Sequence, residues 1–265
     1  MTTTKITTVG ALLLAVSLCA CGNGGGAALL IASSDAVGSN SSALGSGTTP
    51  TPPPTFQSSD GLRFSLTEAR VNLRDIRIDL PPGSACADVA LELRGAECKN
   101  SGDSHTIVVA GPLVVDLLTG KSTPDLSALR IPAGTYKRID FRLDDGRRED
   151  LPAGDELVDR SFVARAEYQH EGQSGRLELL LKFNEDARFQ SDAGVVVEDG
   201  ATLLAMLRPE IWLEGLPLKA CLEKKDVEPA NGVLRLDDKA KGDCSDAENL
   251  VKRNIKRSGD LRKPR

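Results

Sequence analysis

Few residues of this chain could carry out acid–base or metal chemistry. Its 265 residues include two histidines, His105 and His170, which we expect at the start and the end of strands. The sequence lacks the Gly-x-Ser-x-Gly elbow of serine esterases, the His-Glu-x-x-His pattern of zinc proteases and a phosphate-binding P-loop. We therefore expect no metal and no cofactor, and catalysis would have to depend on acidic side chains.

The best-placed acidic pairs are Asp144-Asp145 and Glu149-Asp150, in a stretch that contains a strong turn signal at Gly146. Calcium requires six to eight oxygen ligands, and this stretch lacks the alternating ligands and the closing glutamate of an EF-hand loop. A solvated turn between two strands is the simpler interpretation. A hydrolase that uses these four carboxylates is the alternative.

Aromatic side chains are scarce, with six Phe, two Tyr and one Trp. Most of the phenylalanines fall on the apolar parity of alternating runs, which indicates core positions. Trp212 has the opposite parity to Ile211 and Leu213, which predicts an exposed ring. It is the candidate residue for ligand contact, because exposed indole rings bind sugars and proteins well.

Two further reactive side chains, Cys19 and Cys21, directly follow the apolar stretch Val9–Leu18. With Lys5 in front, this stretch has the length of a signal-peptide core, whereas a transmembrane helix needs about 20 apolar residues. Leu18-Cys19-Ala20-Cys21 resembles the lipobox of bacterial lipoproteins. The resemblance implies cleavage after Ala20 and attachment of diacylglycerol and palmitate to Cys21.

The alternative is an ordinary secretory signal cleaved near Ala20, which would leave Cys21 unmodified. In the lipoprotein family, an aspartate directly after the modified cysteine retains the protein in the inner membrane. Gly22 occupies that position here. The resemblance therefore implies anchoring in the outer membrane, on a face that the sequence does not specify.

The four remaining cysteines are Cys86, Cys98, Cys221 and Cys244. An even number in an exported chain predicts two disulfides, and three pairings are possible. Proximity in the sequence favours Cys86–Cys98 and Cys221–Cys244. A four-thiolate zinc site is the rival interpretation, but the tight Cys-x-x-Cys spacing of such sites is absent.

Composition divides the chain into four parts: a signal peptide (1–20), a lipidated cysteine with a Gly-, Ser-, Thr- and Pro-rich tether (21–60), a folded domain (61–217) and an appendage (218–265). The tether has almost no charge and few large apolar groups, so we expect it to be disordered. The apolar island Leu29–Ile31 would then lie near the lipid surface. A flexible tether of this length spans about 35 Å.

Alternation of apolar and polar residues dominates from Gly61 onward. It predicts nine or ten short strands, including one between Cys86 and Cys98 around Val89–Leu93. A change of parity near Arg74-Asp75 predicts a β-bulge. The absence of any strand–helix–strand rhythm favours an all-β fold, an antiparallel β-sandwich.

The end of the chain differs in charge and pattern. Residues 56–217 hold 19 basic and 28 acidic side chains, whereas residues 218–265 hold 13 basic and 9 acidic ones. Ser245 followed by Glu248 matches a capping box and predicts a short helix over 246–257, ended by Gly259. The basic end could bind phosphate-rich surfaces or form a solvated, frayed terminus.

The central passage resembles a family of bacterial lipoprotein domains of unassigned function. The residues that carry the resemblance are Val114–Gly120 and Ile131–Tyr136, an "IPAGTY" turn before a strand, within a similarity that covers roughly 61–215. The family implies a β-sandwich on an outer-membrane lipoprotein and supplies no catalytic residues.

Three functions follow from these observations. The first is a non-enzymatic envelope lipoprotein, anchored in the membrane by lipid on Cys21, that binds a protein or glycan through its β-domain. The second is a structural spacer without a ligand, and the third is a hydrolase of envelope polymers that uses the acidic turn. Nucleic acid is not an expected partner of an exported chain, and the oligomeric state stays open.

Overall fold

The computed structural model describes residues 26–34, 52–89, 93, 95–101, 104–237 and 239–264. The proposed signal peptide and Cys21 therefore lie outside the described residues. The chain is half strand and 13% helical, arranged as a β-sandwich with a short C-terminal helix. No helix in the described ranges has the length and apolar character needed to cross a bilayer.

The helices are few and short, and the strands vary from two to seventeen residues. The strands are β1 (Ala27–Ala32), β2 (Thr55–Gln57), β3 (Arg63–Asp79), β4 (Ala96–Ser101), β5 (Ser104–Asp116), β6 (Ser122–Thr123), β7 (Arg130–Ile131), β8 (Gly134–Leu143), β9 (Phe162–His170), β10 (Gln173–Leu181), β11 (Glu185–Val197), β12 (Thr202–Leu207), β13 (Val233–Arg235) and β14 (Gly259–Arg262). The α-helices are α2 (Leu218–Glu223) and α3 (Ala247–Arg257), and the 3-10 turns are η1 (Cys86–Asp88), η2 (Leu126–Ala128), η3 (Pro209–Ile211) and η4 (Gly242–Cys244).

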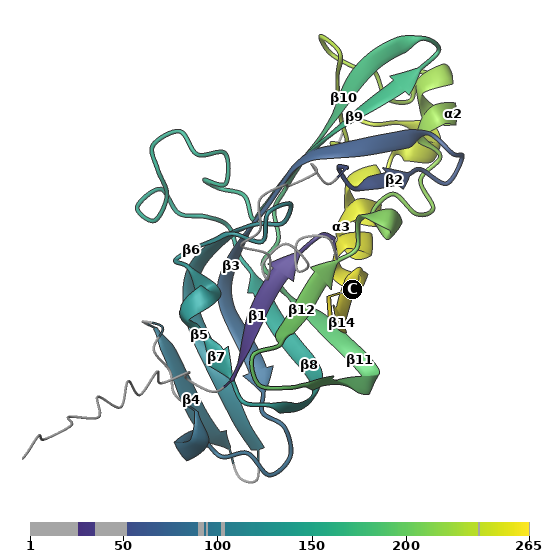
Figure 1. Ribbon diagram of the computed structural model, residues 1–265. Coiled ribbons are helices and arrows are strands. Elements are labelled where there is room, and N and C mark those ends of the chain that lie inside the picture. The colour runs from purple at the N-terminus through teal and green to yellow at the C-terminus, as the bar shows by residue number, and fades with distance from the viewer. Residues whose placement is uncertain are drawn as a thin grey trace, which may run out of the picture.

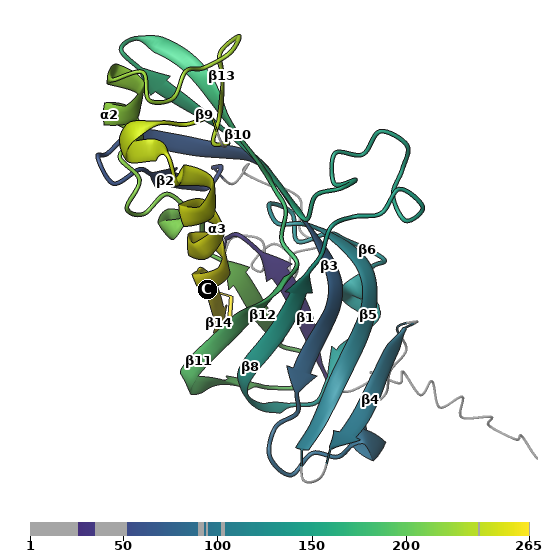
Figure 2. The ribbon, with the colours of Figure 1, turned by 180° about the vertical axis from the view of Figure 1, so that it is seen from behind.

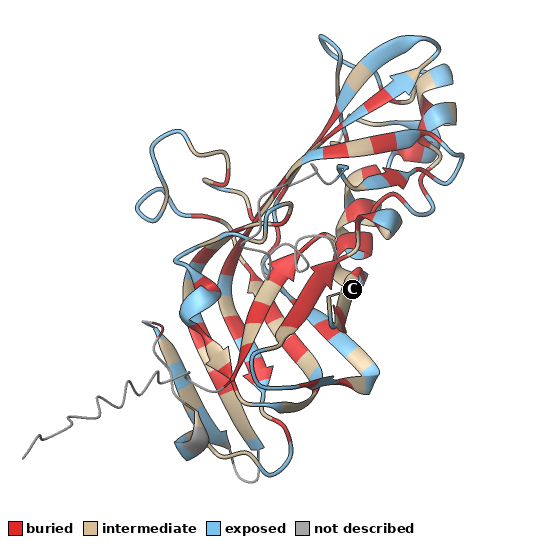
Figure 3. Ribbon diagram, viewed as in Figure 1, coloured by how far each residue is buried: buried red, intermediate tan, exposed pale blue. Residues whose placement is uncertain are grey.

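The strands form two layers. The large sheet has the order β11-β8-β3-β9-β10-β13, with β5, β4, β2 and β6 attached along β3 and β5. The small sheet, β14-β12-β1-β7, lies against one face of it, and the apolar side chains of both sheets meet between them (Figures 1 and 3). Most pairs are antiparallel, as expected, but β1–β12 and β10–β13 are parallel, so both sheets are mixed.

The long strand β3 is the centre of the large sheet, because it pairs with β2, β5, β8 and β9. Its register shifts between Leu73 and Asp75, which confirms the predicted bulge. Gly111 lies opposite this bulge. A Cβ atom there would lie 2.3 Å from the carbonyl oxygen of Leu73 and 2.4 Å from that of Arg74, so only glycine fits.

The tether interpretation is wrong for part of residues 21–60. Ala27–Ala32 forms β1 in the interior of the small sheet, and Leu29 and Ile31 are buried in the main core rather than lying at a lipid surface. Residues 55–57 form β2 on the large sheet. An uncharged, Gly-flanked segment can join the core because β12 and β7 supply the backbone hydrogen bonds that it needs.

The C-terminal residues belong to the same core as the rest of the sandwich. Leu218, Val251 and Leu261 pack into the main apolar cluster, and β14 extends the small sheet along β12. The helix predicted over 246–257 is confirmed as α3. Its cap is not the predicted Ser245: the N-cap residue is Asp246, whose carboxylate instead accepts hydrogen bonds from Asn249 and Arg253.

The basic end is ordered through Pro264 and is not a frayed terminus. Lys256 forms an ion pair with Glu185, and Arg257 with Glu214 at 2.7 Å. These pairs place positive charges of α3 against acidic residues of the sandwich, in addition to the buried apolar contacts of the C-terminal residues.

Both favoured disulfides are confirmed. Cys86 and Cys98 join η1 to β4, with 5.5 Å between their Cα atoms, and Cys221 and Cys244 join α2 to η4 at 6.2 Å. The strand predicted at Val89–Leu93 is wrong for Val89, which lies in irregular chain after η1, and Leu91 falls outside the described residues. The strand in this region starts at Ala96.

Candidate functional site

A cleft of about 1250 Å³ lies where β2, β3, β9, β10 and β13 meet near η3. These elements lie at one end of the molecule, beyond the small sheet (Figures 1 and 2). Ten polar side chains line it: Thr55, Gln57, Arg63, Ser65, Glu167, Gln169, Ser174, Arg176, Glu210 and Asn231. The lining therefore offers carboxylates, guanidinium groups, amides and hydroxyls within one concavity.

A tight hairpin positions two of the cleft's strands. Glu171 and Gly172 both have positive φ, as a two-residue type I′ turn requires, and they pair His170 with Gln173. Gly175 then lies opposite Tyr168, and a Cβ atom at Gly175 would lie 2.5 Å from the tyrosine ring. The missing side chain lets Tyr168 lie across β10.

Aromatic rings support the cleft from within. Phe56 stacks on Phe64 with 5.4 Å between ring centroids, and Tyr168 lies 5.5 Å from Phe64. Burial raises the pKa of the Tyr168 phenol, so this hydroxyl stays protonated at neutral pH and can both donate and accept a hydrogen bond. Tyr168 therefore combines a buried ring with a hydroxyl that can form hydrogen bonds.

Trp212 belongs to this aromatic cluster and is not a surface residue. Its side chain is fully buried, with edge-on contacts to Phe162 at 5.3 Å and Phe56 at 5.9 Å. Its Nε1–H donates to Ser258 Oγ at 3.3 Å. The prediction of an exposed Trp212 that contacts a ligand is wrong. The chain leaves strand geometry after β12 and forms η3, so the alternation of a strand no longer determines which side chains are exposed there.

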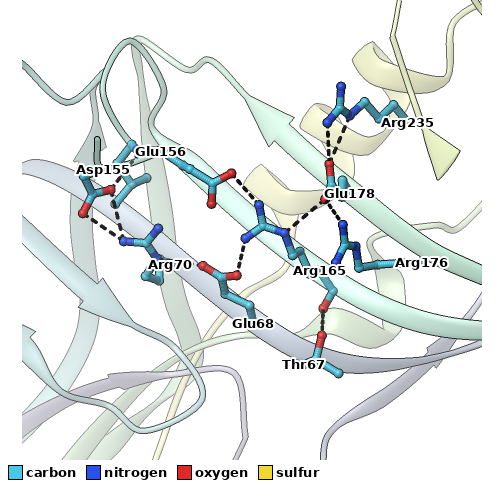
Figure 4. Close-up of polar contacts among 10 residues, drawn as sticks. Thr67, Glu68, Arg70, Asp155, Glu156, Arg165, Arg176, Glu178 and Arg235 are labelled. Atoms are coloured by element: carbon cyan, nitrogen blue, oxygen red, sulfur yellow. Dashed lines mark hydrogen bonds and ion pairs between the residues drawn. The ribbon is translucent and has the colours of Figure 1, made fainter. Parts of the chain in front are cut away.

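An ion-pair network continues from the cleft along β3, β9 and β10 (Figure 4). Glu178 is its centre: the carboxylate is 4% exposed and pairs with Arg176 at 2.9 Å, Arg235 at 2.8 Å and Arg165 at 3.2 Å. Arg165 also pairs with Glu68 and Glu156. One residue, Arg176, belongs to both the network and the cleft lining.

The arginines of the network keep Glu178 and Glu156 charged. Burial raises the pKa of Glu178, but hydrogen bonds from Arg235 and Arg165 outweigh burial and hold that pKa below its usual value. A hydrogen bond from Arg165 likewise lowers the pKa of Glu156, and these partners raise the pKa of Arg165. Carboxylates that are already ionised and paired serve as structural anchors rather than as proton donors.

The acidic turn singled out from the sequence does not form a converging site. Asp144 lies 3.4 Å from Arg74, and its backbone carbonyl accepts a hydrogen bond from Asn72. Asp145 is partly buried, whereas Glu149 and Asp150 are exposed. Within the described ranges, the four carboxylates do not bring three ligand atoms together as a metal ion would require.

One group that sequence reasoning missed lies at the tip of the β9–β10 hairpin. Ligand atoms of His170, Glu171 and Glu223 lie within 4.8 Å of one another. Glu171 and Glu223 are exposed, and exposed carboxylates often gather without an ion, so we assign no metal to this group. The other histidine, His105, bonds to Asn100 at 2.7 Å.

Pattern reasoning did not find the cleft either, because its residues come from six separate segments. The polar lining residues that lie in strands occupy the exposed parity, where polarity is expected with or without a ligand, and Glu210 and Asn231 lie outside strands. Only tertiary pairing brings Gln57, Glu167 and Asn231 to one place.

No known family model, no curated protein and no solved structure matches this chain.

Proposed function

We propose that this protein is an envelope lipoprotein, anchored by acyl chains on Cys21, that binds a glycan in the cleft without catalysis. The observation that carries the proposal is the lining of the cleft, in which ten polar side chains lie within one concavity. The lipobox-like sequence supports the anchor, and the two disulfides support export to an oxidising compartment.

The mixture of groups in the cleft favours sugar hydroxyls as ligands. Amides such as Gln57 and Gln169 both donate and accept hydrogen bonds, while Arg63 offers a fork of donors and Glu167 a pair of acceptors. A hydroxyl also donates and accepts, so it can bind to any of these groups. The charges of both signs in the lining favour a neutral or zwitterionic glycan over a strongly anionic one.

Binding fits the electrostatics better than hydrolysis does. A glycosidase requires a carboxylic acid whose pKa is raised, so that it can protonate the leaving oxygen. Among the described carboxyl groups, each resolved pKa shift is downward, as at Glu156 and Glu178. Glu178, which pairs with the lining residue Arg176, is therefore an acceptor of hydrogen bonds rather than a proton donor.

The test is a titration of the purified full-length protein with soluble envelope glycans, including peptidoglycan fragments and lipopolysaccharide-derived oligosaccharides. We expect one class to bind, and Arg63→Ala combined with Gln169→Ala to weaken it about tenfold or more, since two polar contacts are worth roughly 1.5 kcal/mol or more together. Lys182→Ala, an exposed change outside the lining, is the matched control. Equal affinity in the double variant, or no binding by any glycan, would overturn the proposal.

A protein partner is the second candidate, favoured by one feature of topology. β13 lies at the end of the large sheet and pairs only with β10 among the described strands. An extended peptide could add to its other side by backbone hydrogen bonding. The N–H and C=O of Val233 already bond to Ala230 within the chain, so such a peptide would pair beyond Val233, along Leu234 and Arg235.

A further inference from the structure

The position of β1 limits how far this domain can lie from a membrane. Gly26 is the first described residue, and its carbonyl oxygen accepts a hydrogen bond from the backbone nitrogen of Gly200 at 3.0 Å. A side chain at Gly26 would contact Arg130 and Ile131 at 3.1 Å, so this residue is packed against β7. Gly26 and the strand that follows it, Ala27–Ala32, are therefore fixed to the sandwich.

Only four residues separate Gly26 from Cys21. Five Cα-to-Cα steps span at most about 18 Å even when fully extended. The Ser-, Thr- and Pro-rich residues that resemble a spacer lie between β1 and β2 in the sequence, so they follow β1 instead of preceding it. They cannot lengthen the connection between Cys21 and the domain.

The residues around Gly26 form one end of the molecule, which we call the proximal end: residues 80–87, 131–134 and 198–201. The three segments are contiguous. Gly200 bonds to Gly26, the Ile131 position pairs with Ala27, and Gly134 packs against Pro81, where an added Cβ would lie 2.5 Å from the ring. Figures 1 and 2 show the start of β1 in the half of the molecule away from the β9–β10 hairpin, with η1 and the adjoining ends of β4 and β5 further along the long axis.

The chemistry of the proximal end suits a membrane surface. Residues 80–87 and 131–134 contain no charged side chain, in a chain in which 27% of residues are charged. Pro82, Ala87 and Ala133 are exposed there. Small neutral side chains can enter the headgroup layer without losing the hydration of a charge. The third segment, 198–201, carries the acidic pair Glu198-Asp199 beside the Gly200 that bonds to Gly26.

We infer that the proximal end rests on the bilayer that holds the acyl chains of Cys21, and that the cleft points away from it. This inference depends on the lipid anchor in the proposed function. The headgroup layer is about 5–8 Å deep on each side of the hydrocarbon, so a connection of about 18 Å or less keeps the proximal end at or near the surface. The cleft lies at the opposite end, open to ligands in the aqueous space.

The test measures how close two labelled sites lie to a membrane. Full-length lipidated protein is reconstituted into phosphatidylethanolamine and phosphatidylglycerol vesicles that contain a lipid with a nitroxide headgroup. A fluorophore is attached to Asp199→Cys at the proximal end or to Gln173→Cys on the hairpin, both exposed sites. The other mature cysteines are disulfide-bonded or acylated under the proposal, so each introduced thiol is labelled selectively.

We expect quenching at position 199 to be several-fold stronger than at position 173. A twenty-residue Gly/Ser insertion after Gly24 should remove most of this difference while the protein stays on the vesicles. Equal quenching at both sites in vesicle-bound protein would overturn the inference and leave the anchor standing. Unlipidated wild-type protein, or vesicle binding that persists in Cys21→Ser, would instead overturn the anchor in the proposed function.

Discussion

Glu178 shows how one residue can be both buried and charged in this fold. Its carboxylate accepts hydrogen bonds from Arg165 and Arg235 and pairs with Arg176, so its negative charge is matched from three sides. We expect Glu178→Gln to lower the free energy of unfolding by about 1–3 kcal/mol, because charge-assisted bonds are lost and the neighbouring arginines lose a partner. Urea unfolding measures this change, and Asp192→Asn, at an exposed site, is the control.

The Glu178→Gln variant also tests how the free energy of unfolding depends on pH. The pKa of Glu178 is lower in the folded chain than in the unfolded one, so its ion pairs stabilise the fold above the unfolded pKa of about 4.3. That contribution is lost as the pH falls through the folded pKa. The difference in unfolding free energy between wild type and Glu178→Gln should therefore be largest near neutral pH and shrink below about pH 4. A difference that does not vary with pH would show that the carboxylate's charge is not what stabilises the fold.

At the scale of the element, β1 is the segment whose role differs most from its sequence pattern. Ile31 is 2% exposed in a strand held between β12 and β7. Ile31→Asp should cost about 4 kcal/mol or more, since it buries an unpaired carboxylate in an apolar core. Val196→Asp, at a strand position that is 56% exposed, should change stability by about 0.5 kcal/mol or less. A stable Ile31→Asp protein would restore the tether interpretation of this segment.

Local signals predicted the elements that depend on local sequence. The alternation in Phe162–His170 and Gln173–Leu181 predicted a hairpin correctly, because a short turn joins the two strands. The parity change at Arg74-Asp75 predicted a bulge correctly, because one extra residue moves the following side chains to the other face of the sheet. β1 pairs in parallel with β12, some 170 residues later in the chain, and no local pattern specifies such a partner. The cleft shares this limitation, since Gln57, Glu167 and Asn231 converge only through long-range pairing.

At the scale of the whole molecule, the C-terminal segment closes the sandwich. Asn254 in α3 donates hydrogen bonds to the backbone carbonyls of Trp212 and Glu214, and Ser258 accepts one from the indole of Trp212. Leu261 in β14 adds to the main apolar core beside β12. Residues 61–217 would therefore lack part of their core if they were separated from the rest of the chain.

Truncation after Pro217 tests this dependence directly, and the single tryptophan of the chain is the reporter. Removal of residues 218–265 uncovers Trp212 and leaves its Nε1–H and carbonyl without their partners, which should prevent cooperative folding. We expect tryptophan emission shifted to the red, as for a solvated indole, and no sharp thermal transition. Removal of residues 263–265 alone should preserve both signals, since the sandwich elements end at Arg262. Native emission and cooperative melting of the 1–217 protein would show instead that the last 48 residues are an appendage.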